Sequence, residues 1–168
     1  PALQPTSSSL IYINFSKDEF RLGGSSFAQV LNFLGDEVPD VKDAKYFAKT
    51  FETVQQLIGK DLVLAGHDVS EGGLITTLLE MCFSVPETGM KLSLTKLGDD
   101  IIKTLFSESP AILIQVEDEK KVADILKTHH VQFEVIGEVT ADRVIKIETT
   151  DELVLQFSGP WGQVTYWE

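Results

Sequence analysis

The sequence predicts a single α+β domain, residues 1–168, in which a mixed β-sheet is covered by helices. Short runs rich in β-branched and aromatic residues alternate with longer segments whose apolar residues recur at helical spacing. Of the 168 residues, 43% are hydrophobic, which is enough for one hydrophobic core. No segment repeats at a fixed period, so a solenoid is excluded. A sheet with helices packed on it buries the apolar side of both kinds of element.

The first third of the chain contains one predicted strand and two predicted helices. Residues 10–15 are rich in Ile and aromatic residues and follow a serine run, which is typical of a strand. Ser25 or Ser26 is a suitable N-cap for a helix that extends to about residue 34. In residues 43–58 the apolar side chains recur every three or four positions, which predicts an amphipathic helix.

The rest of the chain continues the alternation. Residues 62–65 and 111–116 are apolar runs that indicate buried strands, whereas residues 71–83 place apolar side chains on most of a helix surface. Asp118 is a suitable N-cap for a helix from residue 119 to about 129. We further expect a helix over residues 99–106, strands over 90–94, 133–139, 144–147 and 153–157, and a segment 159–168 of undetermined structure.

The charge of the chain limits its partners. With 14 Lys and Arg against 26 Asp and Glu, the formal net charge is −12. Only Arg21 and Arg143 are arginines, so a surface that neutralises nucleic-acid phosphates or anionic lipids is not expected. An anionic ligand would have to be bound by backbone amides, a few lysines or a metal ion.

Cysteine content and the first residues indicate the compartment. Cys82 is the single cysteine, which excludes an internal disulfide and suits a reducing compartment, so we expect the cytoplasm. Residues 1–9 have no targeting signal, and no apolar stretch approaches the length that a bilayer requires. A first residue other than Met suggests a piece of a longer chain.

The segment L-V-L-A-G-H-D-V-S-E-G-G-L-I-T-T-L-L-E, residues 62–80, has the pattern of a ligand site. We expect a buried strand to end at residue 65 and a polar turn at residues 66–70 to lead through Gly72 and Gly73 into a helix. Unpaired amides at a glycine-rich helix start can bind an anion. Asp68 could hold Mg²⁺ there, and the Ser70 hydroxyl could reach a phosphate oxygen.

A purely structural interpretation of the same turn is also open. Asp or Ser before a helix is commonly an N-cap, and a double glycine can serve close packing of a helix on a sheet. The segment is not a G-x-x-x-x-G-K-(S/T) loop, because no lysine follows the glycines. His67 could orient Asp68 or contact phosphate, or it could be a hydrogen-bonded structural residue.

The motif resembles a known family. H-D-V-S-E-G-G-L at residues 67–74, followed by L-L-E-M at 78–81, resembles the H-D-x-S-(D/E)-G-G-L…E-M signature of formylglycinamidine ribonucleotide synthetase, also called phosphoribosylformylglycinamidine synthase. Other segments resemble the same family in the same order: L-I-Y-I-N at 10–14, R-L-G-G-S at 21–25, P-D-V-K-D at 39–43, K-L-G-D-D at 96–100, L-F-S-E-S…I-L-I-Q-V at 105–116 and T-Y-W-E at 165–168.

The resemblance implies a fold, a reaction and partners. The fold would be that of the C-terminal domain of the aminoimidazole ribonucleotide synthetase superfamily. In the family, ATP and glutamine convert formylglycinamide ribonucleotide to formylglycinamidine ribonucleotide in de novo purine biosynthesis, through an iminophosphate that ammonia displaces. The N-terminal synthetase-like domains and a glutaminase domain of the same polypeptide would be the partners, and this chain alone would be inactive.

The resemblance also assigns residues. Asp68 matches the family's Mg²⁺ ligand and Ser70 its ATP contact, while Gly72 and Gly73 match the motif glycines and would act through their backbone. No catalytic residue is assigned. The turn at residues 21–25 could line an interdomain cleft or be a plain turn with an N-cap.

Two departures from the family pattern leave alternatives. Val69 stands where many long-form members have Arg, and Glu71 where they have Asp. S-E-S-P at residues 107–110 replaces the more usual N-E-E-L-G, as in short-form synthetases and related kinases. The alternatives are a homologous domain of aminoimidazole ribonucleotide synthetase, thiamine monophosphate kinase or selenophosphate synthetase, or a non-catalytic assembly module.

Overall fold

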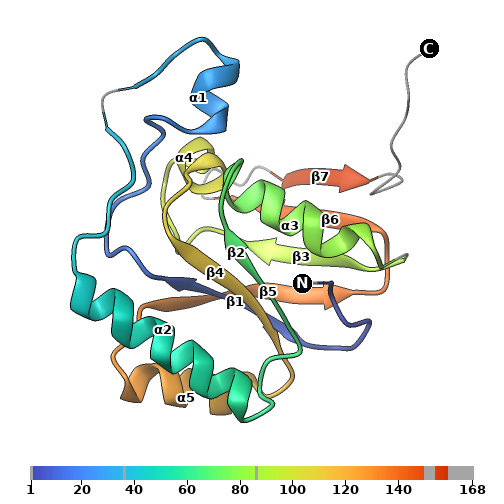
Figure 1. The fold of residues 1–168 in the computed structure, drawn as a ribbon. Coiled ribbons are helices and arrows are strands. Elements are labelled where there is room, and N and C mark those ends of the chain that lie inside the picture. The colour runs from blue at the N-terminus through green and yellow to red at the C-terminus, as the bar shows by residue number, and fades with distance from the viewer. Residues whose placement is uncertain (1, 36, 86, 150–153, 159–168) are drawn as a thin grey trace.

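The computed structural model describes residues 2–35, 37–85, 87–149 and 154–158. Within them, seven strands form one mixed sheet (Figure 1). Neighbouring strands are antiparallel except β3 and β6, which are parallel. In spatial order the strands are β2 (Ala65–Val69), β4 (Ala111–Val116), β1 (Ser9–Asn14), β5 (Phe133–Thr140), β3 (Gly89–Ser93), β6 (Val144–Glu148) and β7 (Val154–Ser158).

Helices cover both faces of the sheet and make three layers (Figure 1). Helices α2 (Ala44–Gly59) and α5 (Glu119–Thr128) lie on one face. Helices α3 (Gly73–Phe83) and α4 (Ile101–Phe106) lie on the other face. The short helix α1 (Ser26–Val30) lies beyond the sheet next to α4, where the ring of Phe27 is 4.6 Å from that of Phe106. The predicted α+β class and the sheet covered by helices are confirmed.

Strand β1 connects the two halves of the core. Leu10 and Tyr12 belong to the core on the α3 face, whereas Ile11 and Ile13 belong to the core on the α2 and α5 face. All four side chains are at most 2% exposed. Because successive side chains of a strand point to opposite faces, a strand that is apolar at every position must be covered on both sides.

Aspartate side chains begin three of the helices. Asp43 accepts hydrogen bonds from the backbone N–H groups of Lys45 and Tyr46, and Asp100 caps α4 in the same way. Asp118 accepts a hydrogen bond from the Lys121 N–H, which confirms the predicted start of this helix. Each cap satisfies amides that have no acceptor within the helix.

The predicted helix up to residue 34 is wrong in length, because α1 ends at Val30. Asn32 has a positive φ of 54°, which a continuing right-handed helix excludes. Val30 and Leu31 are 81% and 60% exposed, so no packing stabilises further turns. Ser25 does accept a hydrogen bond from the Ala28 N–H, as expected of the N-cap.

Two further expectations concern the C-terminal part of the chain. Strand β7 overlaps the strand predicted over residues 153–157 and pairs with β6. The segment 159–168, with Trp161, Trp167 and the T-Y-W-E close, lies outside the described residues. Among the helices that are described, none is long and apolar enough to cross a membrane.

The packing of β4 gives a stability prediction. Leu113 is fully buried between β1 and β2, so Leu113→Ala should lower the free energy of unfolding by about 2–5 kcal/mol through lost burial and a residual cavity. Leu31→Ala, at a side chain that is 60% exposed, should change it by less than about 0.5 kcal/mol. Urea unfolding of both variants checks this, and equal effects would contradict the assigned core.

Candidate functional site

The H-D-V-S-E-G-G-L motif begins in a strand and not in a turn. Residues 65–69 form β2 and pair in antiparallel register with residues 111–115 of β4, so the predicted turn at 66–70 and the predicted strand at 62–65 are wrong. Strand β2 is an edge strand, and an edge position accepts polar residues that a central strand would exclude. Of the apolar run, residues 62–64 precede β2, and the Leu64 N–H donates a hydrogen bond to the Gln115 carbonyl of β4 (2.9 Å).

Asp68 and Ser70 lie at the open end of β2. The Asp68 side chain is 76% exposed, and Ser70 is exposed as well. The backbone carbonyl of Asp68 accepts a hydrogen bond from the Thr77 hydroxyl (3.0 Å), which ties the strand to α3. The carboxylate of Asp68 is therefore held in position through its backbone while it stays accessible to a ligand.

His67 has acceptors at both ring nitrogens. Its Nδ1 lies 2.8 Å from the backbone carbonyl oxygen of Asp68 and 3.5 Å from Oδ1 of the same residue. Its Nε2 lies 3.1 Å from Oε2 of Glu80 on α3. The His67 side chain is 17% exposed, so it mainly connects β2 to α3. The contact with Glu80 corresponds to the structural role considered for His67, and the contact with the Asp68 carboxylate corresponds to the orienting role.

Gly72 and Gly73 form the start of α3 by their backbone shape. Both have positive φ, 85° and 75°. A Cβ on Gly72 would lie 2.2 Å from Oγ1 of Thr76, and a Cβ on Gly73 would lie 2.6 Å from the carbonyl oxygen of Leu105. Gly72 is the N-cap, and no side chain caps it, so the interpretation of Asp68 or Ser70 as N-cap is wrong. The double glycine thus permits close packing within α3 and of α3 on α4, and not the packing of a helix on the sheet that the sequence suggested.

Glu108 occupies the amides at this helix start. Its Oε1 accepts hydrogen bonds from the backbone N–H groups of Gly72 and Ser26, each 2.8 Å long. Partial burial acts to raise the pKa of the Glu108 carboxyl, but the two N–H donors stabilise the ionised form, so this pKa lies below its ordinary value. The Gly73 N–H donates to the Ser70 carbonyl (3.0 Å). An anion at these glycines would therefore have to displace acceptors that belong to the chain itself.

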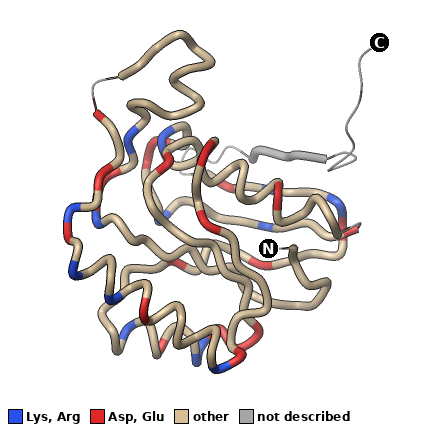
Figure 2. Tube along the Cα trace, viewed as in Figure 1, with Lys and Arg blue, Asp and Glu red and all other residues tan. Residues whose placement is uncertain are grey.

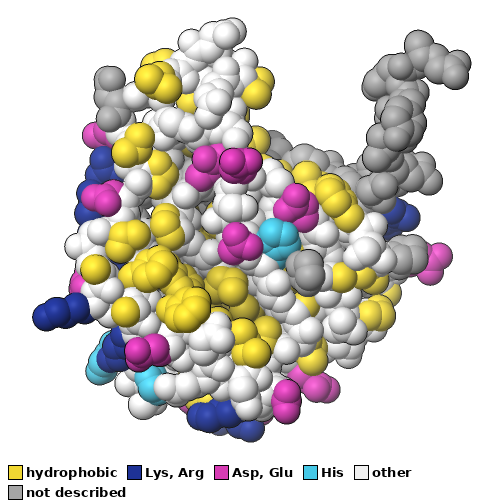
Figure 3. Space-filling model, in the orientation of Figure 1, with side chains coloured by type: hydrophobic (Ala, Val, Ile, Leu, Met, Phe, Trp, Pro, Cys, Tyr) yellow, Lys and Arg dark blue, Asp and Glu magenta, His cyan; other side chains and the backbone are white. Residues whose placement is uncertain are grey.

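A cavity of about 310 Å³ adjoins Asp68 and Glu108. Phe15, Phe47 and Phe51 supply much of its apolar lining. Figure 3 shows apolar side chains gathered on this side of the molecule, with acidic side chains next to them. The site thus combines an apolar floor with two carboxylates.

The sequence on either side of Asp68 contains no basic residue over a long stretch. Between Lys60 and Lys91 the sequence has no Lys or Arg, and Figure 2 shows acidic residues along this part of the trace. The described residues contain no group of three or more His, Cys, Asp or Glu that could hold a metal ion. Asp68 does fit the common arrangement in which one or two carboxylates bind Mg²⁺ together with phosphate oxygens and water.

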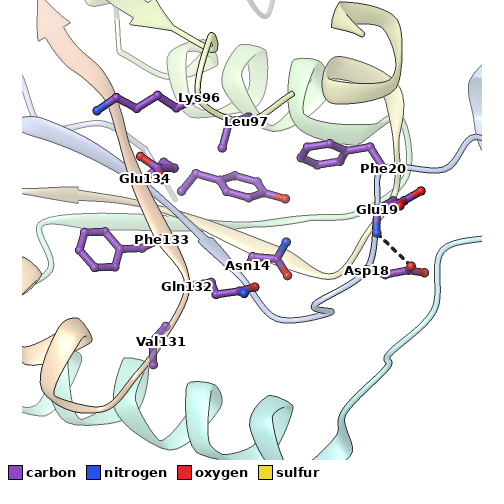
Figure 4. Close-up of a pocket in the computed structure, with 11 residues that line it drawn as sticks. Asn14, Asp18, Glu19, Phe20, Lys96, Leu97, Val131, Gln132, Phe133 and Glu134 are labelled. Carbon is purple, nitrogen blue, oxygen red and sulfur yellow. Dashed lines mark hydrogen bonds between the residues drawn. The ribbon is translucent and has the colours of Figure 1, made fainter. Parts of the chain in front are cut away.

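A second cavity, of about 440 Å³, lies beside the end of β1 (Figure 4). The turn after β1 already uses several of its polar groups. Oδ1 of Asn14 accepts hydrogen bonds from the N–H groups of Ser16 and Lys17, and the buried carboxylate of Asp18 lies 3.2 Å from Nε of Arg21. These groups stabilise the turn, and sequence reasoning did not single out the cavity.

The turn at residues 21–25 lies against the same helix start. The Arg21 N–H donates to the buried Ser107 hydroxyl (3.0 Å), and the Ser26 N–H donates to Glu108. The structure thus brings together three segments that the sequence analysis noted separately: residues 21–26, 67–74 and 105–109. Glu108 was missed as a site residue, although an acidic residue between two serines before an apolar strand was a visible signal.

These observations define a class: a three-layer α+β domain that presents a carboxylate and a glycine-rich helix start beside the edge strand of its sheet. Residues 13–149 match the family model for the AIR synthase related protein, C-terminal domain. The chain belongs to this family.

Two curated relatives are each described as a probable phosphoribosylformylglycinamidine synthase. A probable phosphoribosylformylglycinamidine synthase, chloroplastic/mitochondrial, of Arabidopsis thaliana is 38% identical over 141 residues, which cover 83% of this chain and 10% of the relative. A probable phosphoribosylformylglycinamidine synthase of Caenorhabditis elegans is 33% identical over 158 residues, covering 85% of this chain and 12% of the relative. The chain spans about a tenth of the length of these relatives.

Solved structures share the fold. PurL of T. maritima complexed with ATP has a TM-score of 0.66 at 16% identity, over 99% of this chain and 28% of that one. The same protein complexed with FGAR has a TM-score of 0.67 at 19% identity, over 99% and 30%. A HypE–HypF complex has a TM-score of 0.57 at 18% identity, over 95% and 54%.

The close packing at Gly73 gives a prediction for the helix start. Gly73→Ala should lower the free energy of unfolding by about 2–4 kcal/mol, because the new Cβ adds strain at positive φ and presses on the backbone at Leu105. The matched control is Gly59→Ala, where a Cβ would meet nothing within 4 Å. Chemical denaturation of both variants tests this; a neutral Gly73→Ala would contradict the backbone conformation.

The hydrogen bonds to Glu108 predict a pH dependence. A carboxyl whose pKa is lowered by folding adds stability above its unfolded pKa, and this stability is lost as the pH falls through the folded value. The stability difference between wild type and Glu108→Gln should therefore be constant at neutral pH and shrink as the pH falls below the ordinary value of 4.5. Urea unfolding of both proteins from pH 7 to 3 measures it. A difference that does not change with pH would contradict the ionised state of Glu108.

Proposed function

We propose that this chain is a domain of a longer phosphoribosylformylglycinamidine synthase and contributes one wall of its nucleotide site. The family membership and the two relatives with that name support the proposal. The observation that carries it is the placement of the H-D-V-S-E-G-G-L motif, which puts Asp68 and Ser70 in exposed positions beside the start of α3. The reaction would be the ATP- and glutamine-dependent conversion of formylglycinamide ribonucleotide to its amidine, in purine biosynthesis.

A longer polypeptide is supported by the surface of the domain as well as by its relatives. Val30, Leu31, Phe33, Leu34 and Val38 are between 57% and 81% exposed. Neighbouring exposed apolar side chains of this size are typical of an interaction surface. The proposed partners are the other domains of the same polypeptide, the synthetase-like domains and the glutaminase domain. This chain would be inactive without them.

ATP with Mg²⁺ is the proposed ligand. T. maritima PurL, which shares the fold, has been solved with ATP, ADP and AMPPCP. A bound Mg²⁺ would neutralise phosphate charge, and Asp68 would be one of its ligands while the Ser70 hydroxyl contacts a phosphate oxygen. In this proposal Gly72 and Gly73 shape the turn, because their N–H groups already donate within the chain.

Electrostatics decide how the domain contributes. Asp68 and Glu108 adjoin the same cavity and would repel a polyphosphate that lacked a counter-ion. The sequence offers no cation between Lys60 and Lys91 to compensate. The domain would accordingly orient the nucleotide through its metal ion, and the other domains would supply the cationic groups that bind its phosphates directly.

The fold alone does not select this reaction. A HypE–HypF complex contains a similar fold at a TM-score of 0.57, and a shared fold does not imply a shared function. The phosphoribosylformylglycinamidine synthase assignment depends instead on sequence identity of 38% and 33% over most of this chain.

The cytoplasm is the proposed compartment, because a single, unpaired cysteine suits a reducing environment. Cys82 is fully buried, and burial raises the pKa of its thiol to about 11, so it behaves as a small apolar core residue. The Arabidopsis relative is described as chloroplastic/mitochondrial, which concerns that protein.

Removal of the Asp68 carboxylate tests the nucleotide proposal. In a longer protein that contains this domain, Asp68→Ala should weaken Mg·ATP binding about tenfold or more, because a metal ligand is lost. Asp124→Ala, at an exposed residue of α5, is the control and should leave the affinity unchanged. Isothermal titration calorimetry gives both dissociation constants.

Two results would oppose the proposal. Equal Mg·ATP affinity in wild type and Asp68→Ala would remove the metal role of Asp68. Glutamine-dependent amidation of formylglycinamide ribonucleotide by the 168-residue chain alone would contradict its dependence on further domains.

A further inference from the structure

We propose that Glu108 is a positioning residue, a carboxylate clasp that fixes the turn at residues 21–26 against the start of α3. One oxygen, Oε1, accepts hydrogen bonds from the N–H groups of Ser26 and Gly72, each 2.8 Å long. Ser26 is 82 positions from Glu108 in the sequence, and Gly72 is 36 positions away. A single side chain therefore joins segments that no local interaction could bring together.

Neighbours of Glu108 reinforce the same connection. The buried Ser107 hydroxyl accepts a hydrogen bond from the Arg21 N–H (3.0 Å) and lies 2.9 Å from the hydroxyl of Ser109, which is also buried. The side chains of Ser107 and Glu108 thus accept at both ends of the turn at 21–26, at Arg21 and at Ser26. Glu108, whose carboxylate is the clasp, is the one charged residue of this S-E-S segment.

The chemistry of the clasp requires an acceptor that is strong and small. Two N–H donors converge on one oxygen, and a charged acceptor makes stronger hydrogen bonds than a neutral one. The backbone that presents the Gly72 N–H fits only glycine, because its φ is 85° and a Cβ there would lie 2.2 Å from Oγ1 of Thr76. The two donors also hold the pKa of Glu108 below its ordinary value, so the clasp is ionised at neutral pH.

The clasp bears on the nucleotide site, and this step rests on the proposed function. Glu108 adjoins the same cavity as Asp68, and the Gly72 N–H that it binds follows Ser70 by two residues. Loosening the clasp would let the start of α3 move relative to residues 21–26 and would displace Asp68 and Ser70 from a common ligand. Glu108 would act through these residues without touching the nucleotide.

Hydrogen exchange of individual amides tests the clasp itself, without any nucleotide. In the 168-residue chain, Glu108→Ala should accelerate exchange of the Ser26 and Gly72 amides by about 10- to 100-fold, and Glu108→Gln should give a smaller acceleration because one acceptor oxygen remains. Glu52→Ala, at an exposed carboxylate of α2, is the matched control and should leave both amides unchanged. Unchanged exchange of both amides in Glu108→Ala would overturn the clasp.

Chemical rescue by formate distinguishes a lost carboxylate from general damage. Sodium formate should slow exchange of the Ser26 and Gly72 amides in Glu108→Ala and raise its melting temperature, relative to sodium chloride at the same ionic strength. The wild type should not respond. No response of Glu108→Ala to formate, or an equal response of the wild type, would overturn the assignment. If Glu108→Ala does not fold, the same comparison is made with Glu108→Gln, which should show the intermediate exchange without rescue.

Calorimetry on a longer protein that contains this domain tests the positioning role. Glu108→Ala should weaken Mg·ATP binding about tenfold, with partial recovery in Glu108→Gln and on addition of formate. Unchanged affinity despite faster amide exchange would overturn the positioning role and leave the proposed function intact. Release of the Ser26 and Gly72 amides from Glu108 when Mg·ATP binds the wild type would also overturn it, since Glu108 would then be a displaceable substitute for phosphate. Unchanged binding in Asp68→Ala would instead be a failure of the proposed function.

Discussion

Burial of β1 and β4 on both faces is the constraint on which the rest of the structure depends. Leu10, Ile11 and Ile13 of β1, and Leu113 and Ile114 of β4, are all fully buried. Two strands that are apolar at successive positions can be stable only if helices cover both sides of the sheet. The placement of α2 and α5 on one face and of α3 and α4 on the other follows from this requirement.

The antiparallel position of β4 between β1 and β2 creates the site. Ala111, the first residue of β4, is paired with Asn14 at the end of β1 and with Val69 at the end of β2. The segments that leave β1 and β2 therefore meet the segment that enters β4 at the same end of these three strands. Glu108 lies in that entering segment, which explains how its carboxylate reaches amides from both of the others.

Charge distinguishes this edge from a self-sufficient phosphate site. Asp68 is exposed, Glu108 is held ionised by amide donors, and the segment between Lys60 and Lys91 contains no basic residue. Phosphate-binding helix starts usually leave their first amides free for the ligand. Here the chain's own carboxylate and carbonyl oxygens accept from Gly72 and Gly73, which is why the proposed role of the domain is to orient a metal-bound nucleotide.

The sequence by itself determined the α+β class, most helices, the aspartate cap at Asp118 and the family to which the chain belongs. These features depend on local periodicity, on capping and on a motif, all of which are written in consecutive residues. Only the tertiary structure decided that residues 65–69 are an edge strand, that α1 is short, and that Glu108 joins two distant turns. Strand pairing and long-range hydrogen bonds depend on which segments the sheet places side by side, and a linear pattern does not contain that information.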